Sequence, residues 1–448
     1  MTNPTLPWAR LYNIFDPFSP LMPGQIESLF VERPHSPLAR LSYELGPDHL
    51  PQRVLLVGQP SSGKSTELAR LAADLGGQDM VVARIDLDQN LDASRVNPVE
   101  TLFLMGLAVY KVADALYGDV PGKAPDRKPV EEMNEALKTI VTSYTKIESP
   151  LDLKREIEEL VCFTATGVAG AVAGPAGAAI TEAMVRGVAA VTRRLPFVSG
   201  TTAEVVRKTE VAPTIRAMAD ALNRLIADVE AKSGKPLVVL VDGLDRLQDA
   251  DLVELLFADE QAFLNSPACR VVYIAPSVVA YDRAFGVTRG RFSIFRFPNI
   301  QLHKPRTQGG RSQRAEAGWK TMQAICDRRL KYLGLSRDQV IDEDALEILI
   351  QRSGGHVRDF IRFFRNATVN AQITGSLRID RAAAEEAFWE LRRLYDAQLR
   401  PALRKILDQV AETNQLTDDP DCDRLLYSSI ILNYTDHENW YDVHAVLW

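Results

Sequence analysis

Five short apolar runs occur in the first 300 residues, and each has the length of one buried strand. The second, third and fourth are rich in β-branched side chains, as is typical of parallel strands that are buried on both faces. Stretches with helical periodicity lie between most of the runs. The alternation predicts a doubly wound α/β sheet that binds ligands at the carboxyl ends of its strands. The runs are residues 54–57, 81–87, 237–241, 270–275 and 294–297.

From about residue 307 the strand pattern stops, and amphipathic helices are predicted instead. Ser353-Gly354-Gly355 separates two of these helices, because glycine pairs end helices. The last segment, from residue 403, has the order helix, helix, strand, turn and strand, which fits a winged helix. The four predicted helices before it are residues 313–333, 342–352, 357–372 and 380–394, and the last segment has a helix at 422–429 and strands at 430–434 and 440–446.

The N-terminal residues are rich in proline and aromatic side chains, which predicts an ordered but irregular arm wrapped on the next domain. About 150 residues separate the second and third strands, far more than a crossover needs. The segment between these strands therefore contains an insertion. We expect an N-terminal arm (1–50), an α/β domain (51–306) with an insertion at about 112–235, a helical lid domain (307–400) and a winged-helix domain (401–448).

Composition fits a folded protein, with 46% hydrophobic and 25% charged residues. The four cysteines lie far apart without metal-ligand spacing, so we expect reduced thiols that fill the core. The first residues lack the basic and apolar regions of a secretion signal, which favours a cytoplasmic location. The net charge of −7 argues against a general nucleic-acid binder.

Residues 161–181 carry no charge and consist mostly of alanine and glycine. One interpretation is a membrane or pore-forming helix pair, supported by the small residues Gly170 and Gly174 at helical spacing. The alternative is a flexible or self-packed loop. Alanine and glycine gain little from lipid, and Pro175 interrupts a helix, so membrane insertion is not favoured.

The segment from Gly58 to Thr66 has the spacing G-x-x-x-x-G-K-S, directly after the first strand and before a helical stretch. Glycines let the backbone N–H groups point inward at an anion, and the helix adds the positive end of its dipole. Lys64 would reach the β- and γ-phosphates of ATP or ADP, and the Ser65 hydroxyl would bind Mg²⁺. The alternative is a glycine turn without a ligand. The predicted nucleotide-binding residues are Gly58, Pro60, Ser61, Ser62, Gly63, Lys64, Ser65 and Thr66.

Hydrolysis needs an acidic partner on a neighbouring strand, and Asp242 follows the third apolar run. Its carboxylate would hold Mg²⁺ through water, whereas the alternative is a solvated strand end. Asp245, three residues further on, is the candidate that polarises the attacking water. The alternative for Asp245 is a helix N-terminal cap.

These motifs resemble the AAA+-related signal-transduction ATPases with numerous domains (the STAND group), which are close to the origin-recognition type of AAA+ protein. Further similar runs are Arg270-Val-Val-Tyr-Ile-Ala-Pro-Ser277 and Gly354-Gly-His-Val-Arg358-Asp. The resemblance implies that Ser277 is the polar sensor 1 residue. It also implies that Arg358 is the sensor 2 arginine, which reaches from the lid to the γ-phosphate.

Some assignments stay open beside this resemblance. Arg358 could instead form a surface salt bridge with Asp359, and Arg289 or Arg291 could act as an arginine finger in trans. Family members often carry Asp-Glu at the strand tip, whereas Arg246 follows Asp245 here, so hydrolysis is expected to be slow or to need activation. The family's long repeat arrays are missing, so we expect the sensor or effector to be a partner protein or the insertion.

The C-terminal segment 401–448 has three basic residues against nine acidic ones, which does not favour DNA binding. The leading hypothesis is an ATP-binding and hydrolysing regulatory switch whose nucleotide state moves the lid and the winged helix. That movement would control homo-oligomerisation or a partner effector, and the family type implies bacterial defence or signalling. The alternatives are a DNA-linked AAA+ loader and a membrane-acting effector that uses residues 161–192.

Overall fold

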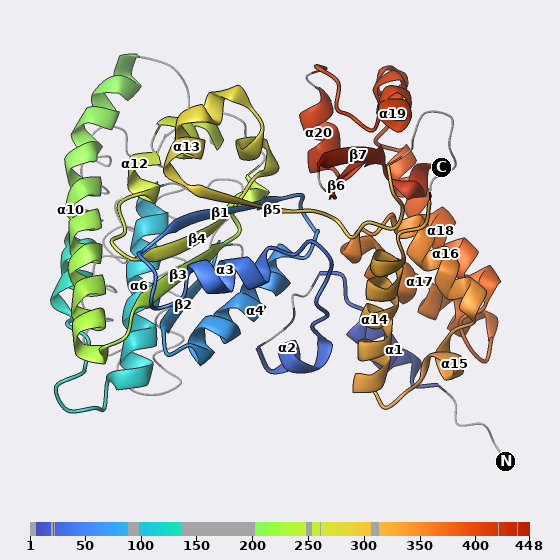
Figure 1. Cartoon of the computed structure of the whole chain (residues 1–448), viewed down its shortest axis with the longest axis horizontal. Helices are drawn as coiled ribbons and strands as arrows, with labels where there is room; N and C mark the ends of the chain where they lie inside the picture. Colours follow the sequence, from blue (N-terminus) through green and yellow to red (C-terminus); the bar gives the residue numbers. More distant parts are fainter. Residues whose placement is uncertain are drawn as a thin grey trace, which may run out of the picture. The chain divides into compact units, whose positions relative to one another are not determined.

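The computed structural model divides into two compact units (Figure 1). Unit 1 consists of Met1–Ala39, Gly58–Leu71 and Arg296–Trp448, and unit 2 consists of Arg40–Val57 and Ala72–Phe295. The loop after the first strand therefore clusters with the C-terminal part of the chain. The described residues are 6–18, 21, 23–87, 98–136, 202–247, 253–259, 261–305, 313–419, 421–436 and 438–448.

The five predicted strands are confirmed, and they form one sheet in the order β2-β3-β4-β1-β5 (Figure 1). The pairs β2–β3, β3–β4 and β4–β1 are parallel, which confirms the predicted α/β fold class. The carboxyl ends of these strands lie along one edge of the sheet. The strands are β1 (Arg53–Gly58), β2 (Val81–Asp86), β3 (Leu237–Asp242), β4 (Arg270–Ala275) and β5 (Ser293–Phe297).

Strands β3 and β4 are buried at every position, as their continuous apolar runs predict. Alternate residues of the sheet pack against the long helices α6 (Pro98–Tyr117) and α10 (Thr202–Ser233), which form the ends of the predicted insertion. Burying each large aliphatic side chain contributes about 1.5–3 kcal/mol relative to exposure. The shorter elements of this region are η2 (Leu244–Arg246), η3 (Leu255–Asp259), α12 (Gln261–Leu264), η4 (Ser277–Ala280), η5 (Arg283–Phe285) and α13 (Gly286–Arg291).

The N-terminal arm is more regular than its sequence predicts. It contains the helices α1 (Trp8–Ile14), α2 (Pro23–Leu29) and α3 (Leu38–Glu44). Each stretch between prolines is long enough for about two helical turns. The ring of Phe15, directly after α1, stacks on Phe364 with centroids 3.8 Å apart. The first part of the arm is thus packed onto the helical region of unit 1.

The predicted helical region is confirmed. Four helices match the predicted ones within three residues at each end, and a single short turn, α15, was not predicted. Asp380, the N-cap of α18, accepts a hydrogen bond from the Ala383 N–H at 2.9 Å, and left-handed glycines end α16 and α17. The helices are α14 (Glu316–Tyr332), α15 (Arg337–Val340), α16 (Glu343–Ser353), α17 (Val357–Thr374) and α18 (Arg381–Asp396).

Residues 401–448, called the C-terminal segment below, have the predicted order of two helices followed by two strands. The two strands pair in antiparallel register, with Asn433 opposite Tyr441. The elements are α19 (Pro401–Thr413), α20 (Asp421–Tyr427), β6 (Ile431–Thr435), β7 (Asn439–Val443) and η6 (Ala445–Leu447).

The alanine- and glycine-rich segment 161–192 lies outside the described residues. Within the described ranges, no helix combines the length and the apolar character that crossing a membrane requires.

The cysteines of the described ranges are Cys269, Cys326 and Cys422, and all three are free and buried. Burial raises the pKa of the Cys269 and Cys326 thiols well above the usual value, so these two stay protonated and unreactive. Core filling, as predicted, accounts for these residues.

The glycine pair between α16 and α17 separates the two helices and allows the backbone of Ile300 to approach closely. Gly354 and Gly355 have left-handed φ angles of 60° and 81°. The Ile300 N–H donates to the Gly355 carbonyl at 3.2 Å. A Cβ atom on Gly355 would lie 1.7 Å from the Ile300 oxygen, so only glycine fits here.

Substitution of this glycine is therefore expected to be costly. Gly355→Ala adds a backbone clash to the strain of a positive φ angle, and we expect the free energy of unfolding to fall by about 3 kcal/mol or more. Gly375→Ala is the matched control, because Gly375 has a φ of 74° with nothing near its Cβ position. Chemical denaturation of both variants would measure the difference, and equal losses would contradict the close approach of Ile300.

Candidate nucleotide site and its polar network

The loop between β1 and α4 (Lys64–Gly77) is a tightly curled turn. Ser61 and Gly63 have left-handed φ angles of 68° and 104°, and the Ser62 N–H donates to the Gln59 carbonyl at 3.3 Å. A Cβ atom on Gly58 would lie 2.5 Å from the carbonyl oxygen of Phe297, the last residue of β5, so this close approach requires glycine at the first position of the motif. Successive turns of this kind direct backbone N–H groups into one concave surface.

Lys64, the first residue of α4, is buried, with 3% of its surface exposed. Its Nζ donates to the carbonyl of Gly58 at 2.9 Å and to that of Gln59. The ammonium group is therefore held at the base of the loop by the carbonyls of the loop itself. Ser65 and Thr66 follow in the first turn of α4, and both are half-buried.

Arg33, in the N-terminal arm, packs on this loop and was missed by the sequence analysis. Its Nη1 donates to the Ser62 carbonyl at 2.8 Å, its Nε lies 3.4 Å from Glu67 Oε1, and its guanidinium lies 3.6 Å from the ring centroid of Phe297. Burial lowers the pKa of Arg33 to about 10, although Glu67 opposes this. Its Nη2 is buried and has no hydrogen-bond partner in the described part of the chain.

Glu67 brings a carboxyl group to the first turn of α4. Burial raises its pKa, while Arg33 and a hydrogen bond from the Ser36 hydroxyl at 2.8 Å act in the opposite direction. Arg33 therefore balances an acid that would otherwise repel an anion at this helix terminus.

In unit 2, Asp242 is the last residue of β3 and is almost fully buried. Its Oδ2 lies 3.5 Å from Arg84 Nη2 on β2. The alternative interpretation as a solvated strand end is therefore wrong, because only 2% of Asp242 is exposed and the half-buried Arg84 lies beside its carboxyl group. Asp245 is also buried, and it follows Gly243, which occupies the cap position of η2 with a φ of 103°. Gly243, and not Asp245, is thus the N-terminal cap of η2.

Ser277 and Arg289, two further candidate residues of unit 2, follow strand β4. Val57 pairs with Ala275, so the chain leaves β1 at the same edge at which β4 ends before Ser277. Ser277 is half-buried at the start of η4. Arg289, one candidate arginine finger, donates through Nη1 to the carbonyls of Val279 and Asp282.

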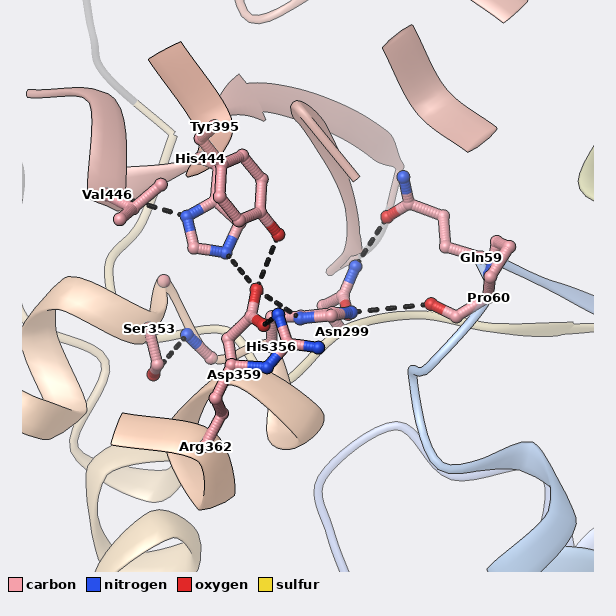
Figure 2. A network of polar contacts seen from close by, with 12 residues as sticks. Gln59, Pro60, Asn299, Ser353, His356, Asp359, Arg362, Tyr395, His444 and Val446 are labelled. Carbon is pink, nitrogen blue, oxygen red and sulfur yellow. Dashed lines mark hydrogen bonds and ion pairs between the residues drawn. The ribbon is translucent and has the colours of Figure 1, made fainter. Parts of the chain in front are cut away.

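Arg358 is the second residue of α17 and is half-buried. The next residue, Asp359, is fully buried and collects several donors on one oxygen (Figure 2). His356 Nδ1 lies 2.9 Å from Oδ2, His444 Nε2 lies 3.1 Å away, and the Tyr395 hydroxyl donates at 2.6 Å. This cluster, called the Asp359 network below, joins α17, α18 and the C-terminal segment.

Electrostatics explains why the buried carboxylate is tolerated. Burial raises the pKa of Asp359, but the imidazoles of His356 and His444 outweigh burial and hold the pKa well below its ordinary value of 3.8. Arg362 Nη1, at 3.4 Å from Oδ1, adds positive charge. The ionised carboxylate is therefore the acceptor on which the surrounding donors converge.

The network reaches the loop between β1 and α4 at one end and the C-terminal segment at the other (Figure 2). His356 Nε2 lies 3.3 Å from the Pro60 carbonyl oxygen. The Val446 N–H donates to His444 Nδ1 at 3.0 Å, so Nε2 of His444 carries the ring proton that faces Asp359. Burial lowers the pKa of His444, although Asp359 raises it.

His356, Asp359 and His444 are also residue types that bind metal ions, and their ligand atoms lie within 4.8 Å of one another. Hydrogen bonding accounts for this arrangement, because a protonated Nε2 of His444 cannot bind a metal while it donates to Asp359. The cluster is therefore a polar connection between elements of unit 1.

Comparison with known proteins identifies a family for more than half of the chain. A family model described as an AAA ATPase domain matches residues 38–266. No curated protein matches. Among solved structures, Cdc6p from Pyrobaculum aerophilum is 11% identical, with 96% of this chain and 93% of that chain covered and a TM-score of 0.41.

Two further structures show the same level of similarity. The Orc1 protein of Aeropyrum pernix in complex with DNA is 12% identical over 97% of this chain and 94% of that chain, with a TM-score of 0.39. Drosophila ORC bound to DNA is 13% identical over 99% and 90% of the two chains, with a TM-score of 0.37. These identities and TM-scores are low, and the family assignment depends on the matched model.

The Asp359 network predicts a large effect of one substitution. Asp359→Asn removes the charge that the histidines and Tyr395 face, and we expect the free energy of unfolding to fall by about 3 kcal/mol, as for other broken buried ion pairs. Asp396→Asn, which removes the exposed partner of Arg392 at 3.4 Å, should cost under about 1 kcal/mol. Urea titrations would measure both, and a loss at Asp359 no larger than the control would contradict the network.

The same network predicts a pH dependence. His444 has a lowered pKa when folded, so below about 6.5 the unfolded chain takes up a proton that the folded chain refuses. The stabilisation from Asp359 is present above 3.8 and is lost as the pH falls through its lower folded pKa. Stability should therefore decrease as the pH falls below about 6.5. Thermal melts at several pH values would measure this, and His444→Gln should flatten the slope just below pH 6.5.

Proposed function

Because the chain belongs to the family of AAA ATPase domains, we propose that it is a regulatory ATPase switch of the signal-transduction (STAND) type. Bound ATP or ADP sets the position of the helical lid domain (307–400) and of the C-terminal segment, which we propose is a winged helix. The family match indicates nucleotide binding and ATPase activity. The observation that supports this proposal is a chain of polar contacts. His356 Nε2 lies 3.3 Å from the Pro60 carbonyl oxygen, and both His356 and His444 contact Asp359.

The chemistry of the loop residues supports nucleotide binding. Lys64 places a buried ammonium at the loop, Arg33 has a spare buried donor beside Ser62, and α4 begins at Lys64 with its N-terminal N–H groups. Positive charge and backbone donors of this kind bind phosphate. The loop residues predicted from the sequence would therefore hold the phosphates, with Lys64 moving from its carbonyl partners to the β- and γ-phosphates.

Ser65 and Asp242 are the residues proposed to hold Mg²⁺, since hydroxyl and carboxylate oxygens are the ligands that this ion prefers. When bound, Mg²⁺ neutralises phosphate charge. Asp245 is proposed to orient the attacking water, while Ser277 and Arg358 are proposed to sense the γ-phosphate. Each of these roles stays a prediction from the sequence motifs.

Turnover is proposed to be slow or to depend on activation. No glutamate follows Asp242 or Asp245, so a carboxylate that usually polarises water is replaced by Arg246. The Asp242 carboxylate also lies 3.5 Å from Arg84, and this ion pair would have to break before the carboxylate could bind a metal ion. A switch that stays in one nucleotide state for long periods is consistent with both features.

The output of the switch is proposed to be self-association or a partner effector. The acidic composition of the C-terminal segment, with nine acidic and three basic residues, favours a protein-facing role over DNA binding. A role in bacterial defence or signalling belongs to this proposal and comes from the family type.

Removal of the loop lysine tests the proposal. Lys64→Ala takes away the ammonium that meets the phosphates, and we expect the Kd for ATP and for ADP to rise by about 100-fold or more. Lys320→Ala, an exposed position in α14, is the matched control and should bind as the parent chain does. Calorimetric titration would measure the affinities. Equal affinity of the Lys64 variant and the parent chain would refute the proposed site.

A further inference from the structure

The loop between β1 and α4, called the phosphate loop below because it is proposed to bind phosphate, contains one residue whose side chain contacts the C-terminal segment. Gln59, which the sequence analysis did not include among the binding residues, is 2% exposed. Its Nε2 donates to the carbonyl oxygens of Leu426 at 2.8 Å and of Ile431 at 2.6 Å. Its Oε1 accepts from the Asn433 N–H at 2.8 Å and from Asn299 Nδ2 at 2.5 Å.

The four bonds use the full capacity of one carboxamide, which has two donor hydrogens and two acceptor lone pairs. Three of the four partners belong to the C-terminal segment, at the end of α20 and along β6. The fourth partner, Asn299, also binds the Asn433 carbonyl, through its N–H at 3.0 Å and its Nδ2 at 3.2 Å. Figure 2 shows the Gln59 side chain extending toward Asn299. Because every donor and acceptor of the Gln59 carboxamide has a partner, these bonds specify one position of the C-terminal segment on the loop.

The backbone of the same residue is tied to the phosphate-binding lysine. Lys64 Nζ donates to the Gln59 carbonyl, while the Gln59 side chain holds the C-terminal segment. The next residue, Pro60, meets His356 of α17. Two adjacent loop residues therefore connect Lys64 with the C-terminal segment and with the lid.

We propose that Gln59 is a clamp that docks the C-terminal segment on the phosphate loop, and that Lys64 keeps the clamp in place through the Gln59 carbonyl. The inference rests on the proposed function, because a phosphate that draws Lys64 away from this carbonyl loosens the clamp. All four side-chain bonds of the clamp are between neutral groups. Neutral hydrogen bonds are individually weak, so the docking is specific and can open and close.

Hydrogen exchange of the full chain tests the clamp directly, because the Asn433 N–H is one of its four bonds. Gln59→Ala should raise the exchange rate of the amides in residues 431–435 by about tenfold or more in the absence of nucleotide. Gln59→Glu should do the same, since a carboxylate would face the carbonyls of Leu426 and Ile431. Gln398→Ala, at an exposed position of the lid region, is the matched control and should leave these amides unchanged.

Nucleotide provides the second arm of the experiment. ADP or a slowly hydrolysed ATP analogue should raise the exchange of residues 431–435 in the parent chain and add little in Gln59→Ala. Unchanged exchange in Gln59→Ala, or an equal effect of nucleotide in both chains, would overturn the clamp. Failure of nucleotide to bind at all would instead overturn the proposed function, and the variants without nucleotide would still decide whether Gln59 docks the segment.

If Gln59→Ala fails to fold, a second variant tests the same contact. Asn299→Ala removes the Nδ2 group that donates to Gln59 Oε1 and leaves the Gln59 side chain in place. It should raise the exchange of residues 431–435 by a smaller factor than Gln59→Ala, about threefold. Thermal melts of each variant would separate local opening from loss of the fold. No rise in Asn299→Ala with an intact melt would count against the clamp.

Discussion

The organisation of unit 1 depends on a single buried charge, the carboxylate of Asp359. An ionised group out of water is costly unless donors surround it, and the donors here come from three different parts of the chain. His356 directly precedes α17, Tyr395 belongs to α18 and His444 lies between β7 and η6. The network thus adds polar links between α17, α18 and the segment after β7, which also pack on one another.

The phosphate loop lies at the edge of that arrangement and faces two ways. Its backbone and Lys64 form the surface suited to an anion, whereas the Gln59 side chain and the Pro60 carbonyl face the C-terminal segment and α17. Charged groups serve the first surface and neutral hydrogen bonds serve the second. A change in the charge on one surface can therefore alter the neutral contacts on the other, because both surfaces are formed by the same loop.

Much of the fold could be predicted from the sequence, because strand runs and helix periods are local signals. The five strands, the helices after residue 313 and the two-helix, two-strand end all follow from patterns within a few residues. The polar contacts could not be predicted in this way. Gln59 and Asn433 are 374 positions apart, and Asp359 and His444 are 85 apart. Arg33 gave no signal either, because its partner lies 29 positions away in a loop that was interpreted only as a phosphate site.

The docking of β6 has a consequence for how copies of the chain could meet. Both backbone groups of Asn433 are occupied from outside the hairpin, the N–H by Gln59 and the carbonyl by Asn299. An undocked β6 would present these groups as an open sheet edge, and open edges pair with strands of other molecules. Closure of the C-terminal segment thus also protects the protein against strand addition, so that exposure of this edge and assembly of copies would be controlled by the same contact.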